Sequence, residues 1–369
     1  MKLLFVGDCV IKNSENFIVP QSLNITSYDY RICNFEAPIS EGKDIALKKV
    51  GPSLSQSRAA AEAVAKAGFN VCLLANNHIM DYGVEALRRT ISFFNENQVF
   101  HVGAGLCFDE IYKPLVLEKE GEKVAIFNLS EAQFGVAKNE YVQCGYAWIG
   151  YYKVFDMIKR YKEEKYFVIM CCHAGLECFS TPLPEWKNIY HRFIDVGVDC
   201  IIASHPHIIQ AVELYKGKYI YYSLGNFFFD SLNTDEDWMT GMVVSIDTTS
   251  NTYCEQYVEI VAGRIDIVTD GEKLKKLQAL NEIIYNDGYI QKLVDNIAAD
   301  TWGRYYKSYY ENTISLKAAI IKRVKKMFGI ISEHEVLNYE WLLHNIQIET
   351  HRYLVERYLY NYNTKENNL

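Results

Sequence analysis

Short apolar runs alternate with segments of helical hydrophobic spacing over the first two thirds of the chain. The length and the β-branched content of five apolar runs predict buried strands over residues 2–6, 30–35, 69–75, 167–172 and 198–202. Residues 51–67, 84–97 and 184–196 carry apolar side chains at helical spacing. Fully apolar strands that alternate with helices are typical of a layered α/β domain with largely parallel strands.

The pattern changes after about residue 270, where strand-like runs give way to segments with helical patterns. We therefore expect a first domain over residues 1–265 and a helical C-terminal extension over 272–369. Within the extension, residues 314–331 combine an apolar helical face with a basic one. Such a helix either docks on a protein core or contacts a membrane surface or a partner complex, and the sequence leaves both readings open.

Side chains that can bind metal ions follow five of the predicted strands. They are Asp8, Glu36, Asn77 with His78, His173, and His205 with His207. Each of them alone would be an ordinary turn or strand-end residue. Open α/β sheets bind ligands at the carboxyl ends of their strands, and parallel strands bring these ends to one edge. The coincidence of all of them at strand ends therefore predicts a single site.

The mixture of carboxylate, amide and imidazole groups suits borderline divalent ions such as Mn²⁺, Zn²⁺ or Fe²⁺. Six or seven donors are too many for one tetrahedral zinc ion. They fit two ions that share a bridging carboxylate and a bridging water. Two neighbouring ions lower the pKa of that water and hold the oxygens of a displacement reaction. The sequence thus predicts one or two divalent ions as cofactors.

Composition narrows the class of protein further. The chain has 369 residues, of which 49% are hydrophobic, so it can bury a large core. Its net charge of −8 argues against a nucleic-acid partner. The ten cysteines contain no C-x-x-C pair, and most lie in apolar runs, as expected for reduced thiols. No signal-peptide pattern and no run of transmembrane length occurs, so we expect a cytoplasmic protein.

Six motifs in fixed order resemble a known family. They are Gly7-Asp8, Asn34-Phe35-Glu36, Asn76-Asn77-His78-x-x-Asp81, His173-x-Gly175-x-Glu177, Ser204-His205-Pro206-His207 and Ser223-Leu224-Gly225-Asn226-Phe227. The chain is similar to the CapA family, the bacterial capsule or poly-γ-glutamate synthesis proteins of the calcineurin-like metallophosphoesterase superfamily. The resemblance covers about residues 1–265 and implies a four-layer α/β/β/α sandwich. The helical C-terminal part lies outside it.

The resemblance also implies a role for each matching residue. It implies metal ligands at Asp8, Glu36, Asn77, His173, His205 and His207. Glu36 is expected to bridge two ions, with His173 and His205 at one ion and His207 at the other. His78 matches a histidine that acts as general acid at the leaving group. The same motifs suggest further contacts to the ligands or the substrate from Asn76, Asp81, Glu177 and Asn226.

Two positions depart from the superfamily pattern. Val10 stands where the wider superfamily has a histidine ligand two residues after the first aspartate, which weakens one of the two metal sites. Glu36 stands where an aspartate is usual, and its longer side chain reaches farther.

Three functions are compatible with these features. The first is a metal-dependent hydrolase that uses a metal-activated water on a phosphoester or on an amide bond in a small molecule, peptide or polymer such as poly-γ-glutamate. The second keeps the fold and the metal but makes the protein a peptide epimerase, which would incorporate deuterium without cleavage. The third is a non-catalytic subunit of a polymer synthesis or export complex, which would need 314–331 but not His205 or His207.

Overall fold

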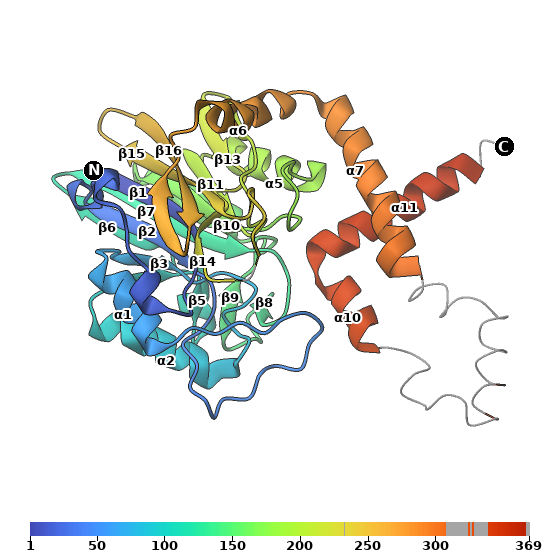
Figure 1. The fold of residues 1–369 in the computed structure, drawn as a ribbon, viewed down its shortest axis with the longest axis horizontal. Coiled ribbons are helices and arrows are strands. Elements are labelled where there is room, and N and C mark those ends of the chain that lie inside the picture. The colour runs from blue at the N-terminus through green and yellow to red at the C-terminus, as the bar shows by residue number, and fades with distance from the viewer. Residues whose placement is uncertain (232, 308–323, 325–326, 328–338, 367–369) are drawn as a thin grey trace. The chain divides into compact units, whose positions relative to one another are not determined.

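The computed structural model of the chain divides it into two compact units, one of residues 1–47 and 53–287 and one of residues 48–52 and 288–369 (Figure 1). The structure describes residues 1–231, 233–307, 324, 327 and 339–366. The basic amphipathic segment predicted over 314–331 therefore lies outside the described residues, apart from Val324 and Met327.

The larger sheet of the first unit contains eight strands among the described residues. In spatial order it runs β17 (Arg264–Ile267), β16 (Thr252–Val261), β15 (Thr240–Asp247), β1 (Lys2–Val10), β2 (Tyr30–Phe35), β3 (Val71–Leu73) and β4 (Phe100–Val102), with β14 (Asn226–Phe229) paired to β1 as well. β1 is parallel to β2 and β14, and the parallel pairing continues through β3 and β4. On the other side, β15, β16 and β17 pair antiparallel, as the alternating pattern of their sequences favours.

The second sheet contains six strands among the described residues. Its order is β12 (Val212–Tyr215), β13 (Lys218–Tyr221), β11 (Cys200–Ser204), β10 (Phe167–His173), β7 (Glu122–Ser130) and β6 (Leu115–Lys119). The four central strands are parallel, whereas β12 and β6 form antiparallel edges. A small third sheet joins β5 (Ala104–Gly105), β9 (Gly145–Ala147) and β8 (Val136–Ala137).

Alternating side chains of β1 separate two hydrophobic layers. Leu3 and Phe5 lie in a core shared with Ile126 and Ile169 of the second sheet, so the two sheets pack face to face. Leu4 lies in the other core, against the helices that cover the outer face of the first sheet. These helices are α1 (Arg58–Lys66), which begins at the Ser57 cap, and α2 (Gly83–Glu96).

Helices on the outer face of the second sheet complete the layers. α4 (Val154–Glu163) packs on β10, and its Tyr161 ring contacts Phe127 of β7 at 5.7 Å. In α5 (Pro184–Asp195), Tyr190 stacks on Tyr222 at 5.5 Å. The helix α3 (Phe108–Tyr112) packs instead on β5 and β9 of the small third sheet. The four-layer α/β/β/α sandwich predicted from the sequence is therefore confirmed for the first unit.

The helix α6 (Gly271–Ile283) lies in the first unit, although the sequence pattern grouped it with the C-terminal helices. Leu277 is 7% exposed and belongs to the core between the sheets. The Asn281 side chain accepts a hydrogen bond from the Val212 N–H of β12 (2.8 Å). A helical pattern reports the local conformation, whereas this packing depends on contacts with distant residues.

The second unit contains α7 (Asp287–Thr301), the π-helical turn η4 (Trp302–Tyr306), α10 (Tyr339–Gln347) and α11 (Glu349–Glu366) among its described residues. Trp302 stacks on Tyr358 at 4.7 Å, and Arg357 contacts Asp295 at 3.1 Å. These contacts hold α7 and η4 against α11.

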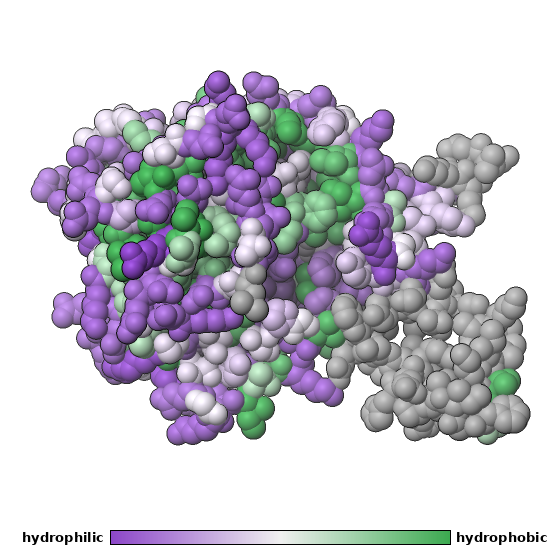
Figure 2. All heavy atoms as spheres, viewed as in Figure 1, coloured by the Kyte–Doolittle hydropathy of each residue, from purple (hydrophilic) through white to green (hydrophobic). Residues whose placement is uncertain are grey.

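On the face drawn in Figure 2, small hydrophobic patches lie among hydrophilic residues. Within the part of the chain that the structure describes, no helix is long and apolar enough to span a bilayer.

Candidate metal centre

The six residues predicted as metal ligands lie together at the carboxyl ends of parallel strands from both sheets. They are Asp8 in β1, Glu36 after β2, Asn77 after β3, His173 at the end of β10, and His205 and His207 after β11. None of these residues is more than 4% exposed. Polar groups buried this deeply need partners, which are either one another or bound ions.

A bulge in β1 turns Asp8 toward the other ligands. Leu3 and Phe5 face the core between the sheets, so strict alternation would turn Asp8 to the helix-covered face. The register with β2 shifts at this point: Phe5 pairs with Ile32, but Asp8 pairs with Asn34. The extra residue in β1 returns the Asp8 side chain to the space between the sheets.

Gly7 lies in this bulge and allows β14 to approach closely. A Cβ atom at Gly7 would lie 1.9 Å from the carbonyl oxygen of Gly225, so a side chain does not fit there. The sequence predicted a first strand over residues 2–6 only, and this end is wrong, because β1 continues through Gly7 to Val10. The glycine redirects the strand instead of ending it.

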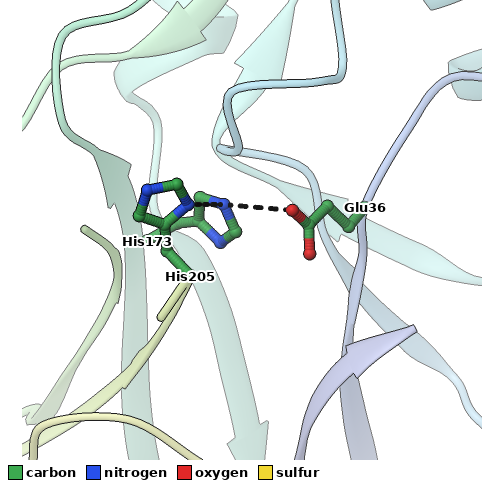
Figure 3. Close-up of side chains that lie close together, drawn as sticks. All are labelled: Glu36, His173 and His205. Atoms are coloured by element: carbon green, nitrogen blue, oxygen red, sulfur yellow. Dashed lines mark hydrogen bonds and ion pairs between the residues drawn. The ribbon is translucent and has the colours of Figure 1, made fainter. Parts of the chain in front are cut away.

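Two groups of three residues share Glu36. In one group, Glu36, His173 and His205 each offer a ligand atom within 4.8 Å of the others; in the second, Asp8, Glu36 and His207 do so. Figure 3 shows the carboxylate of Glu36 facing the two imidazoles of the first group across a gap. Glu36 is 0% exposed, and neither of its carboxylate oxygens has a hydrogen-bond partner among the described residues. A divalent ion on either side would neutralise this buried carboxylate, so the residues fit a metal centre.

Lone pairs converge around Nε2 of His173. This nitrogen lies 3.0 Å from Asn77 Oδ1, 3.1 Å from His205 Nδ1 and 3.5 Å from Glu36 Oε1. A single proton cannot satisfy all these atoms, since a neutral imidazole carries only one N–H. A cation bound by all of them resolves the conflict. With Asn77, the first group therefore has four candidate ligands.

The second group is built around His207. Its Nε2 lies 3.8 Å from Glu36 Oε1, and its Nδ1 lies 3.1 Å from Asn226 Oδ1 and 3.5 Å from Asp8 Oδ2. Trp238 packs on the ring at 4.6 Å. Asn226, which the sequence singled out, therefore orients this imidazole.

Among the described residues, the second group has three candidate ligands, and the valine at position 10 cannot contribute a fourth. Val10 is 1% exposed in β1.

The loop that carries both histidines has a strained backbone. The backbone φ angles are 101° at His205 and 62° at His207, in a region that residues other than glycine rarely adopt. Each such residue costs on the order of 1–3 kcal/mol, and strain of this kind concentrates at functional sites. The loop therefore trades stability for the placement of two imidazoles.

His78 forms a pair with Asp81 beside the cluster. His78 Nδ1 lies 2.6 Å from Asp81 Oδ2, which also accepts a hydrogen bond from the Leu54 N–H (2.8 Å). Asn76 accepts from the His78 N–H (3.3 Å) and donates to the Phe35 carbonyl (3.0 Å). These contacts hold His78 in place, with Nδ1 of its ring turned toward Asp81.

The pKa values of the two buried carboxyl groups, Glu36 and Asp8, are shifted in opposite directions. Burial raises the pKa of Glu36 well above its usual range, and the charge of Asp8 adds to this. Burial also disfavours the charged form of Asp8, but His207, His173 and Asn34 outweigh it and hold the pKa of Asp8 well below its usual range.

The pKa values of the three histidines shift in different directions. Burial lowers the pKa of His173 well below its usual value. For His205 and His207 burial acts in the same direction, but Glu131 and Asp8 respectively outweigh it and raise the pKa. Without an ion the cluster therefore holds protons that a metal would displace.

Glu177 lies at the edge of the site. Its side chain is 55% exposed, and its Oε1 is 3.9 Å from His205 Nε2. This position suits contact with a substrate better than support of a ligand.

Two functional residues were missed by the sequence reasoning. Asn34 donates a hydrogen bond to Asp8 Oδ1 (2.7 Å). It belongs to the motif Asn34-Phe35-Glu36, in which the sequence analysis assigned a role to Glu36 alone. Glu131 is 0% exposed and lies 3.3 Å from His205 Nε2. It directly follows β7, which is not among the five strands that the sequence analysis linked to candidate ligands. Because β7 is also parallel to β10, its carboxyl end reaches the same edge as the ligands, and this was the available signal.

The fold and the buried ligand set define a class: an α/β/β/α sandwich with a candidate divalent-metal centre between the strand ends of its two sheets. The family described as bacterial capsule synthesis protein PGA_cap matches residues 2–231, which is more than half of the chain. The chain belongs to this family.

Characterised relatives have capsule or polymer names. The chain is 32% identical over 208 residues to the capsule biosynthesis protein CapA of Bacillus anthracis, covering 55% of this chain and 51% of that protein. It is 29% identical over 206 residues to the PGA biosynthesis protein CapA of Bacillus subtilis, covering 55% and 53%. The chain thus matches about half the length of these relatives.

Among solved structures, a putative 5'-nucleotidase from Staphylococcus aureus in complex with alpha-ketoglutarate aligns with a TM-score of 0.43 and 14% identity, covering 76% of this chain and 58% of that one.

Proposed function

We propose that this protein is a metal-dependent hydrolase of bacterial capsule or exopolymer synthesis. Its substrate would be a phosphoester, or an amide bond in a polymer or peptide of the poly-γ-glutamate type. Membership of the capsule synthesis family supports the process. The observation that carries the chemistry is Glu36, a fully buried carboxylate without a hydrogen-bond partner among the described residues, shared by two groups of ligand atoms.

Each group of ligands has a proposed task. One ion would be held by Glu36, Asn77, His173 and His205, and a second, with fewer ligands, by Asp8, Glu36 and His207. Bound there, divalent ions make water more acidic and polarise the oxygens of the bond that breaks. The buried walls of the site exclude bulk water, which strengthens these electrostatic effects.

His78 is the proposed proton donor. Asp81 faces Nδ1 and stabilises the imidazolium form, so Nε2 can give a proton to the leaving group. Glu177, exposed at the edge, is proposed to contact the substrate.

The test compares turnover with and without Mn²⁺ on an aryl phosphodiester and on a γ-glutamyl peptide. Wild type is expected to cleave one of them only with the ion, and His205→Ala should lose this activity. His191→Ala is the matched control, because this histidine pairs with Glu213 (2.8 Å) away from the centre and should leave turnover unchanged. Cleavage that survives in His205→Ala would refute the proposal.

The same samples distinguish the epimerase hypothesis. In D₂O, deuterium entering the peptide without cleavage would refute hydrolysis and favour metal-assisted proton exchange. A protein that binds Mn²⁺ but neither cleaves nor exchanges would favour the non-catalytic role in a polymer synthesis complex.

A further inference from the structure

His205 faces the candidate metal centre with one ring nitrogen and a buried carboxylate with the other. Its Nδ1 is 3.1 Å from His173 Nε2, the nitrogen that itself faces Glu36. Its Nε2 is 3.3 Å from Glu131 Oε1. The imidazole ring therefore stands between Glu131 and the ligand atom His173 Nε2, so Glu131 contacts the candidate centre through His205.

The position of Glu131 is fixed by its neighbours. Its backbone N–H donates to the His173 carbonyl (3.1 Å), which continues the pairing of β7 with β10. Gln133 Nε2 donates to its Oε1 (2.7 Å), and the hydroxyl of the fully buried Tyr146 donates to its backbone carbonyl (3.3 Å). A carboxylate held in this way is preorganised to accept the N–H of one particular ring nitrogen.

This arrangement decides which nitrogen of His205 carries the proton. A neutral imidazole has one N–H and one lone pair, and an ionised carboxylate can only accept. With the N–H on Nε2 pointing at Glu131, the lone pair lies on Nδ1 and faces the ligand cluster. The opposite tautomer would place a hydrogen where the ion binds and two lone pairs face to face at Glu131.

We propose that Glu131 is a positioning residue that fixes the Nε2–H tautomer of His205 and orients its Nδ1 as a metal ligand. The inference rests on the metal centre of the proposed function, but not on the reaction catalysed there. A carboxylate partner also makes the imidazole a stronger donor to the ion, and loss of such a partner typically costs about 10–100-fold in metal affinity.

Glu177 cannot replace Glu131 in this role. It lies 3.9 Å from the same Nε2, beyond hydrogen-bond distance, and its side chain is 55% exposed. Water competes for an exposed carboxylate, so its hold on the ring is weaker.

The experiment measures Zn²⁺ affinity by competition with a chelator and the ¹⁵N signals of the histidine rings by NMR. Glu131→Gln should bind Zn²⁺ about 10–100-fold more weakly than wild type. The wild-type His205 signals should show a protonated Nε2 and a metal-bound Nδ1, and the variant should lose this signature. If Glu131→Gln does not fold, Glu131→Asp, which withdraws the carboxylate by one methylene, is measured in the same way.

Glu213→Gln is the matched control. Glu213 is a buried carboxylate that faces Nε2 of another histidine, His191, at 2.8 Å, outside the candidate centre. This substitution should leave Zn²⁺ affinity within about twofold of wild type, even if it lowers stability as much as Glu131→Gln does.

Two results would overturn the inference: Glu131→Gln that binds Zn²⁺ like wild type with unchanged His205 signals, or an affinity loss that Glu213→Gln reproduces. A wild type that binds Zn²⁺ but hydrolyses nothing would instead refute the hydrolase proposal and leave the role of Glu131 standing.

Discussion

Without an ion, Glu36 should lower the free energy of unfolding of the protein. With an ion, it should contribute to stability by binding that ion. The carboxylate is 0% exposed, lacks a hydrogen-bond partner among the described residues and lies near Asp8. An unsatisfied buried polar group costs about 1–3 kcal/mol. Glu36→Gln keeps the shape but removes the ionisable carboxyl, whose burial costs either a desolvated charge or the uptake of a proton, so it should raise the free energy of unfolding of the metal-free protein at neutral pH by about 1–3 kcal/mol. At roughly 2–4 °C per kcal/mol, the midpoint should rise by several degrees.

With the ion present the difference between the two proteins should shift by about 2.3 kcal/mol in favour of wild type. At a free ion concentration 100 times its dissociation constant, wild type gains about 2.7 kcal/mol. Loss of a supporting partner already costs up to about 100-fold in affinity, and Glu36 is itself a proposed ligand in both groups. If affinity falls about 100-fold, the variant gains only about 0.4 kcal/mol at the same concentration.

The assay is thermal and urea unfolding of both proteins with excess chelator and with Mn²⁺. Glu213→Gln serves as control, because Glu213 is hydrogen-bonded to His191 and Tyr222, and its loss should destabilise the protein equally with and without the ion. The reasoning is refuted if Glu36→Gln unfolds more easily than wild type in chelator, or if Mn²⁺ stabilises both proteins equally.

Three further outcomes are expected. Gly7→Ala should destabilise the protein by about 1–3 kcal/mol and weaken ion binding, because the added Cβ would lie 1.9 Å from a backbone oxygen. The control Gly42→Ala, which has no atom within 4 Å of the added Cβ, should have neither effect. Equal unfolding midpoints of the two variants would contradict this prediction. Ion binding should release protons and become tighter as the pH rises, because the raised pKa of Glu36 leaves a proton that competes with the ion. Calorimetry in buffers of different ionisation enthalpy would detect this proton release, and its absence would refute the prediction. His78→Gln should keep ion affinity but slow turnover about 10²–10⁴-fold on substrates with poor leaving groups, and a uniform loss on all substrates would argue against its role as proton donor beside Asp81.

Local sequence patterns determined the elements and the ligand types. Apolar runs placed β2 and β10 to within one residue and β11 to within two, because a buried parallel strand needs a continuous apolar stretch. The polar residues that follow those runs identified Glu36 and the histidines as candidate ligands. The helix α6 shows the limit of this approach: its pattern was correct, but its assignment to a unit depended on packing against distant strands.

The arrangement of the site was decided by contacts between residues far apart in the sequence. No local pattern reveals that the bulge at Gly7 turns Asp8 inward, since the bulge exists only in the register between β1 and β2. The sharing of Glu36 by two ligand groups and the support of His205 by Glu131 likewise depend on how two sheets meet. Sequence alone therefore determined which chemical groups this protein brings to its centre, and tertiary structure decided which atom of each group faces inward.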